Sequence, residues 1–134
     1  MSTNPEKRID TKVLLSTLWI VVMINMLKAD ILSGFIPGAM EEVANIAASA
    51  ATSIPQLMLG GAVMGQLAIA MIILARVLKY SLNRRMNIVI SIITIVYIWG
   101  GMASYPHYLF IASVETICLL LIIGVAWTWR NVTA

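Results

Sequence analysis

The stretch Leu109–Trp127, LFIASVETICLLLIIGVAW, decides the fold of this 134-residue chain. It is apolar almost throughout, and its one charged side chain is Glu115. A helix needs about 20 predominantly apolar residues to cross a lipid bilayer. The stretch therefore predicts a membrane-spanning helix. Within it Glu115 costs about 3 kcal/mol on insertion scales, so a partner, a proton or water is needed to offset the cost of its charge.

The composition of the whole chain agrees with a membrane protein. Hydrophobic residues make up 60% of the sequence and charged residues 11%, whereas soluble domains carry about 25% charged residues. We expect a single transmembrane domain over residues 1–134, with the lipid bilayer as its surroundings. The net charge of +3 comes from basic residues beside apolar runs, where they set topology, and this excludes nucleic acid as a partner.

Four stretches have the length and composition of spans, at about residues 12–33, 55–79, 86–105 and 107–129. The loop at about residues 34–54 carries Met40, Val43, Ile46 and Ala47 at helical spacing, which predicts a short amphipathic helix on the outer side. The sequence thus predicts an all-α fold, an integral membrane four-helix bundle with a short outer helix between its first and second spans.

The basic residues give this bundle an orientation. In a four-span arrangement all of them except Lys28 lie on one side, and basic loops stay in the cytoplasm. We therefore expect a multi-pass protein of the cell membrane with both termini cytoplasmic. The residues on that side are Lys7, Arg8, Lys12, Arg76, Lys79, Arg84, Arg85 and Arg130.

Each predicted span offers one polar side chain to a similar depth. At 1.5 Å per residue, Glu115, Tyr97 and Asn25 lie about 12 Å from the outer edge and Gln66 about 16 Å. Asp30 lies nearer the outside. One interpretation is a structural layer in which these side chains fix the register of the helices. The other is a pocket in the outer half, where Glu115 acts as counter-ion to a small amphipathic or cationic ligand and the other four residues orient it.

Other kinds of site have little support in the sequence. No cluster of His, Cys, Asp and Glu has zinc spacing, and no catalytic triad or phosphate loop is present, so we expect neither an enzyme nor a bound metal or cofactor. Gly61 and Gly65 form a GxxxG pattern for close helix packing, within the chain or in a homodimer. The alternatives to a binding protein are an oligomeric transporter or proton-coupled permeation subunit, and an accessory subunit of a membrane complex.

Three blocks of residues carry a resemblance. They are Leu18-Trp19 to Phe35-Ile36-Pro37-Gly38, Val77-Leu78-Lys79 to Asn83-Arg84-Arg85-Met86-Asn87-Ile88, and Glu115 with Ala126-Trp127-Thr128-Trp129. With these blocks the chain resembles a family of small, uncharacterised four-helix prokaryotic membrane proteins, a domain of unknown function. The resemblance implies four spans, a long first outer loop and marker positions at Asp30 and Glu115, and it implies no activity. In size and layout the chain resembles DoxX-like membrane proteins more loosely.

Overall fold

Helices make up nearly all of the chain in the computed structural model, which describes residues 9–101 and 105–130. Within these residues there are five helices. They are α1 (Thr11–Gly34), α2 (Ala39–Ser49), α3 (Ile54–Val77), α4 (Tyr80–Gly100) and α5 (Pro106–Thr128).

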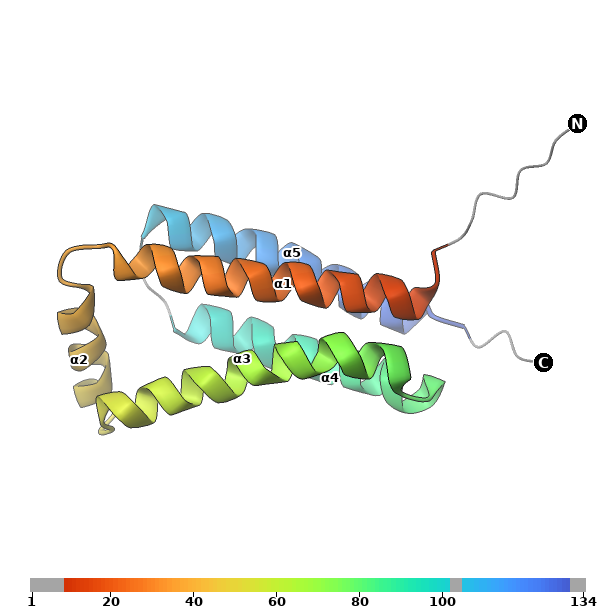
Figure 1. Ribbon diagram of the computed structural model, residues 1–134, viewed down its shortest axis with the longest axis horizontal. Helices are drawn as coiled ribbons and strands as arrows, with labels where there is room; N and C mark the ends of the chain where they lie inside the picture. Colours follow the sequence, from red (N-terminus) through yellow and green to blue (C-terminus); the bar gives the residue numbers. More distant parts are fainter. Residues whose placement is uncertain (1–8, 102–104, 131–134) are drawn as a thin grey trace, which may run out of the picture.

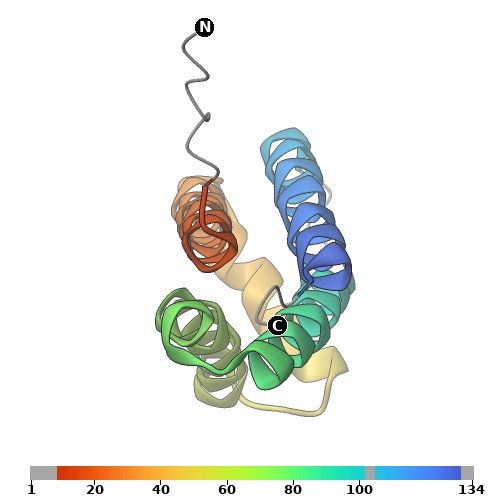
Figure 2. The ribbon, with the colours of Figure 1, turned by 90° about the vertical axis from the view of Figure 1, so that its right-hand side faces the viewer.

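The four long helices form a bundle in which each packs against two others. α1 packs against α3 and α5, and α4 packs against α5 and more sparsely against α3. The view along the bundle in Figure 2 shows this arrangement, with α1 diagonal to α4 and α3 diagonal to α5. α2 lies across one end, where it joins the end of α1 to the start of α3 (Figure 1). Residues on α1 and α4 meet only across the centre of the bundle.

Three helices of the described chain, and not the four expected, are long and apolar enough to cross a membrane. These are α1, α3 and α5. The helix α4 is long enough, but its first two turns contain Asn83, Arg84, Arg85 and Asn87. These polar residues shorten its apolar part, and for this reason the structure gives three candidate spans where the sequence predicts four. Three candidate spans still indicate a membrane protein.

The bounds of α4 also differ from the prediction. The helix begins at Tyr80, six residues before the predicted start at residue 86, and its last residue is Gly100. Buried Asn83 explains the early start, because its Nδ2 donates to the Ala75 carbonyl at 2.7 Å and ties the first turn of α4 to α3. Only Leu78 and Lys79, both in extended conformation, connect the two helices. Residues 102–104 of the predicted span lie outside the described residues.

The core lies where the four long helices face one another. Its largest fully buried apolar side chains are Leu15 and Trp19 on α1, Met71 on α3, and Leu119 and Ile122 on α5. Large apolar side chains are also exposed along all four helices. Such an outer surface is expected where lipid, and not water, surrounds a bundle.

The connection that carries α2 is fixed by local chemistry. Gly38 precedes α2 with φ of 83°, a left-handed conformation that glycine adopts without a Cβ clash. After α2, Ser53 and Gln56 form a capping box at the start of α3, in which each side chain accepts from the backbone N–H of the other. These signals separate the short helix from the long helices on either side.

Candidate functional site

Glu115 is buried in the bundle, on the face of α5 that points inward. Its side chain is 3% exposed. Among the described residues, no hydrogen-bond partner reaches its buried Oε1 atom. Buried polar atoms in proteins are nearly always hydrogen-bonded, and an unsatisfied one costs about 1–3 kcal/mol. The carboxyl group of Glu115 therefore has an unused acceptor position inside the bundle.

Three other titratable side chains lie within electrostatic range of one another and of this region. Asp30 on α1 interacts with Glu115, with Tyr97 on α4 and with Tyr108 on α5. Tyr108 also interacts with Glu115 directly. We call Asp30, Tyr97, Tyr108 and Glu115 the acidic cluster. It draws on three helices near the α2 end of the bundle, and its two carboxyl groups would repel each other if both were charged.

Tyr108 was not among the predicted site residues. It precedes Glu115 by seven residues, two helical turns, so both lie on the same face of α5. Its hydroxyl donates to the Ile98 carbonyl of α4 at 2.7 Å. The hydroxyl proton of Tyr108 is therefore already used in a hydrogen bond to α4. The seven-residue spacing from Glu115 is the signal in the sequence that could have identified Tyr108.

The predicted polar layer is only partly assembled. Asn25 donates from Nδ2 to the Val21 carbonyl at 2.9 Å. This bond lies within α1 and does not connect Asn25 to another helix. Gln66 is exposed, and its helix α3 lies diagonal to α5. The structure thus brings Glu115, Asp30 and Tyr97 into one region and leaves Asn25 and Gln66 engaged elsewhere or exposed.

The two glycines of the GxxxG pattern face residues of the same chain. A Cβ atom at Gly61 would lie 3.3 Å from the Tyr97 hydroxyl on α4, and one at Gly65 would lie 4.0 Å from the Met23 methyl on α1. The missing side chain of Gly61 therefore makes room for the hydroxyl of Tyr97 beside α3.

A second polar group, which the sequence analysis missed, occupies the other half of the core. Trp19 Nε1 donates to Asn87 Oδ1 at 2.8 Å, and Asn87 Nδ2 donates to the Oδ1 and backbone oxygen of Asn83. All three side chains are fully buried. We call Trp19, Asn83 and Asn87 the asparagine chain. Its signal in the sequence is the spacing of Asn83 and Asn87, which Ser91 and Thr94 continue along one face of α4.

Among the described residues, the basic side chains other than Lys28 gather at the end of the bundle opposite α2, which we call the basic end. Lys12 Nζ donates to the Leu78 carbonyl at 2.9 Å, and Arg84 Nε donates to the Ala126 carbonyl at 2.9 Å. Arg76 Nε reaches Ser16 Oγ at 3.1 Å. Cations near the carbonyl ends of helices are favourable, because those ends carry partial negative charge. Lys7 and Arg8 lie outside the described residues.

The acidic cluster is not a metal site of the usual kind. Across the residues that the structure describes, no three His, Cys, Asp or Glu side chains come together as a metal ion would require. The two carboxyl groups and two phenols can bind a proton or pair with an organic cation. Carboxylates attract cations directly, and the faces of phenol rings do so through their quadrupole.

Comparison with known proteins gives a family and no activity. No curated protein and no solved structure matches the chain. The looser likeness to DoxX-like proteins is not shown. The model of the family of unknown function DUF6326 matches residues 5–134, and the chain belongs to this family.

Proposed function

We propose that this protein binds a small cationic or amphipathic ligand inside the membrane, with Glu115 as the counter-ion. The observation that carries the proposal is the Oε1 atom of Glu115, a residue that is 3% exposed, which has no hydrogen-bond partner in the described part of the chain. An ionisable group at such a position is expensive, and a bundle that needed only packing would be served as well by an apolar residue. A ligand with a positive charge would fill the unused acceptor position.

Asp30 supports a cation in preference to an anion or a neutral molecule. It is exposed, lies on the neighbouring helix α1, and interacts electrostatically with Glu115. A cation near Asp30 would reduce the repulsion between the two carboxylates, and both carboxylates would attract it. In this proposal Asp30 is the entry residue, Glu115 holds the charge, and Tyr97 borders the ligand.

The proposal includes a fourth crossing by α4. α3 ends and α4 begins at the basic end, whereas α4 ends and α5 begins at the opposite end. If α3 and α5 both cross the bilayer in the same direction, α4 must return the chain between them. Asn83, Asn87, Ser91 and Thr94 are all buried, so these four polar side chains of α4 face the protein and not lipid.

The basic end gives the orientation in this proposal. Basic segments next to spans stay in the cytoplasm. The basic end would then be cytoplasmic, and α2 and the acidic cluster would lie toward the outside. A ligand would reach Asp30 from the outer solution or the outer leaflet.

The test compares hexylamine, which is positively charged at neutral pH, with hexanol, a neutral probe of equal chain length. Both are titrated into the purified full chain by calorimetry in detergent micelles. We expect hexylamine to bind, and Glu115→Gln to weaken this binding about tenfold, the cost of losing one charge-assisted hydrogen bond. Glu41→Gln is the matched control, because Glu41 is an exposed carboxylate on α2. It should leave the affinity unchanged.

Two outcomes would overturn the proposal. In one, hexanol binds as well as hexylamine, so that charge plays no part. In the other, Glu115→Gln binds hexylamine with the affinity of the unmodified chain. Asp30→Asn gives a graded result, with a smaller loss than Glu115→Gln, because Asp30 acts at the exposed edge of the cluster.

A further inference from the structure

A hollow at the basic end differs from the acidic cluster in position and charge. Its volume is about 270 Å³, and it lies between the first turns of α4 and the last turn of α5. Such a volume lies just below the range of small-molecule pockets, about 300–1,000 Å³, and suits a headgroup better than a whole lipid. The residues that line it are Tyr80, Ser81, Arg84, Arg85, Ile88 and Trp127.

The charge of this lining is positive. It contains two arginines and no acidic residue. The start of α4 adds to the positive field, because the unsatisfied N–H groups of a helix N-terminus carry partial positive charge and α4 has no side-chain cap. The hollow therefore favours an anion over a cation or a neutral molecule.

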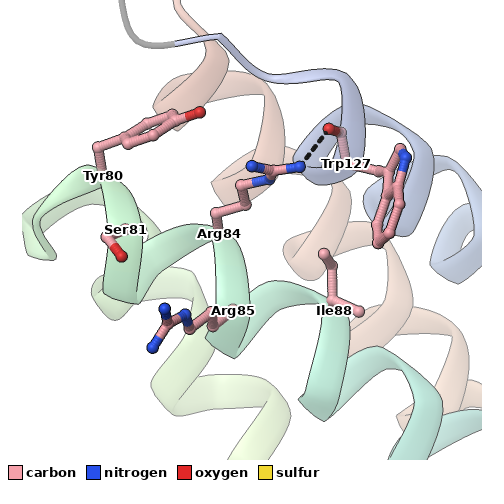
Figure 3. A pocket seen from close by; sticks show the side chains of 6 residues that line it. All are labelled: Tyr80, Ser81, Arg84, Arg85, Ile88 and Trp127. Carbon is pink, nitrogen blue, oxygen red and sulfur yellow. Dashed lines mark hydrogen bonds between the residues drawn. The ribbon is translucent and has the colours of Figure 1, made fainter.

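Arg84 is held in place at the hollow. Its Nε donates to the Ala126 carbonyl at 2.9 Å and its Nη2 to the Trp127 carbonyl at 2.8 Å, so it reaches from α4 to α5 (Figure 3). Its Cζ atom also lies 5.7 Å from the centre of a Trp127 ring. A guanidinium has five N–H donors, and toward the described residues Arg84 uses two of them. The remaining donors are fixed in position for a further acceptor.

Arg85 differs from Arg84 because it is exposed, and its guanidinium extends away from α5 in Figure 3. Arg84 is thus held against α5, whereas Arg85 lines the hollow with an exposed side chain. Arginine matches the oxygens of a phosphate with two parallel hydrogen bonds, which gives phosphate an advantage over a simple anion.

The apolar part of the lining points to lipid. Trp127 is 66% exposed, and Ile88 lies beside it. Tryptophan is enriched at the interface between membrane and water, where its ring sits at the level of the headgroups. A ligand in this hollow would therefore have its anion at the arginines and its apolar part along Trp127 and Ile88.

We propose that the hollow between α4 and α5 binds the phosphate headgroup of an anionic phospholipid. Arg84 and Arg85 contact the phosphate, and Trp127 and Ile88 contact the first part of the acyl chains. Basic pockets between transmembrane helices are suited to lipids of this class. The site is independent of Glu115 and of any ligand there.

Native mass spectrometry of the detergent-purified full chain tests the proposal. Phosphatidylglycerol, which is anionic, is titrated against phosphatidylcholine, which has no net charge. We expect phosphatidylglycerol to bind at least about tenfold more tightly, and Arg85→Gln to weaken it about fivefold, as expected for one basic residue near a lipid surface. Lys79→Gln removes the same charge at the same end from a residue outside the lining, and should change the affinity less than about twofold.

Arg84→Gln alone is a weaker test, because Arg84 also holds the end of α5 and its loss can disturb folding. Arg84→Lys keeps the charge but loses the paired donors, and we expect it to bind phosphatidylglycerol less tightly than the unmodified chain. Equal binding of the two lipids, or equal losses in Arg85→Gln and Lys79→Gln, would overturn the proposal. Displacement of bound lipid by millimolar glycerol phosphate would also overturn it, by assigning the hollow to a soluble phosphate.

Discussion

Trp19 and Asn87 meet across the diagonal of the bundle. The indole Nε1 of Trp19 on α1 donates to Asn87 Oδ1 on α4 at 2.8 Å, and both side chains are fully buried. α1 and α4 have few other means of recognising each other, because each packs mainly on α3 or α5. The bond therefore sets the register of the two diagonal helices.

Removing either partner of this bond should destabilise the bundle. Asn87→Ala leaves the Trp19 N–H and part of Asn83 without partners, and we expect a loss of about 2 kcal/mol in the free energy of unfolding. Trp19→Phe removes the N–H donor together with packing volume. A double-mutant cycle of the two changes, followed by unfolding in a denaturing detergent, should give a coupling of about 1 kcal/mol. Asn45→Ala, at an exposed position of α2, is the control and should leave the free energy of unfolding unchanged. Additive effects at Trp19 and Asn87 would contradict the assigned role.

The buried carboxyl group of Glu115 should lower the free energy of unfolding of the ligand-free protein. Because its Oε1 atom is buried without a partner among the described residues, Glu115→Leu removes a desolvation cost and adds apolar contact. We expect the free energy of unfolding, measured without ligand, to rise by about 1 kcal/mol. Ser113→Leu, an exposed position two residues earlier on α5, should change it little. A loss of stability in Glu115→Leu would instead favour the structural layer that fixes helix register.

The sequence predicts the apolar helices of this fold better than it predicts α4. The first, second and fourth predicted spans differ from α1, α3 and α5 by at most two residues at either end, because long apolar runs carry their own boundaries. In α4 the sequence predicts a connection between two spans at residues 80–85, which include Asn83, Arg84 and Arg85. They are helical, and Asn83 and Arg84 bond to the Ala75 carbonyl of α3 and to the carbonyls at the end of α5. These are contacts between helices, which the pattern of residues within α4 does not reveal.

The candidate site, too, could be predicted only in part from the sequence. Depth along each helix can be counted from the sequence, and it places Glu115, Tyr97 and Asn25 at one level, with Asp30 nearer the outside. The direction in which a side chain points around its helix depends on how the helices pack. For this reason Asn25 and Gln66, at similar depth, do not join the acidic cluster, and Tyr108, nearer the helix end, does.

Gly60 and Gly61 should respond differently to the same substitution. A Cβ atom at Gly60 would meet nothing within 4 Å, whereas one at Gly61 would lie 3.3 Å from the Tyr97 hydroxyl. Gly60→Ala should stabilise the helix by about 0.5–1 kcal/mol through backbone entropy. Gly61→Ala should gain less, because Tyr97 must move. Tyr97→Phe removes the hydroxyl, so in that background Gly61→Ala should approach the gain of Gly60→Ala. Equal effects of the two alanines in the unmodified chain would exclude a close contact.

Tyr105 and Glu42 join the start of α5 to α2, and this contact should be sensitive to high pH. The Tyr105 hydroxyl donates to Glu42 Oε2. This hydrogen bond, followed by burial and the charge of Glu42, raises the pKa of Tyr105 above its ordinary value. A raised pKa means that the folded protein favours the protonated phenol. Its contribution to stability is therefore complete below the ordinary tyrosine pKa of about 10, and is lost as the pH rises through the folded-state pKa.

The ultraviolet absorbance of phenolate measures this titration, and subtraction of the Tyr105→Phe curve isolates Tyr105 from the other tyrosines. We expect Glu42→Gln to shift the titration of Tyr105 to lower pH, toward the ordinary range. Glu41→Gln, which removes the neighbouring carboxylate without breaking the bond, should leave it nearly unchanged. Because the phenol stays protonated at neutral pH, neither variant should show a pH-dependent change in stability there. If Tyr105 titrates at the same pH in Glu42→Gln as in the unmodified chain, the bond does not hold α2 against α5.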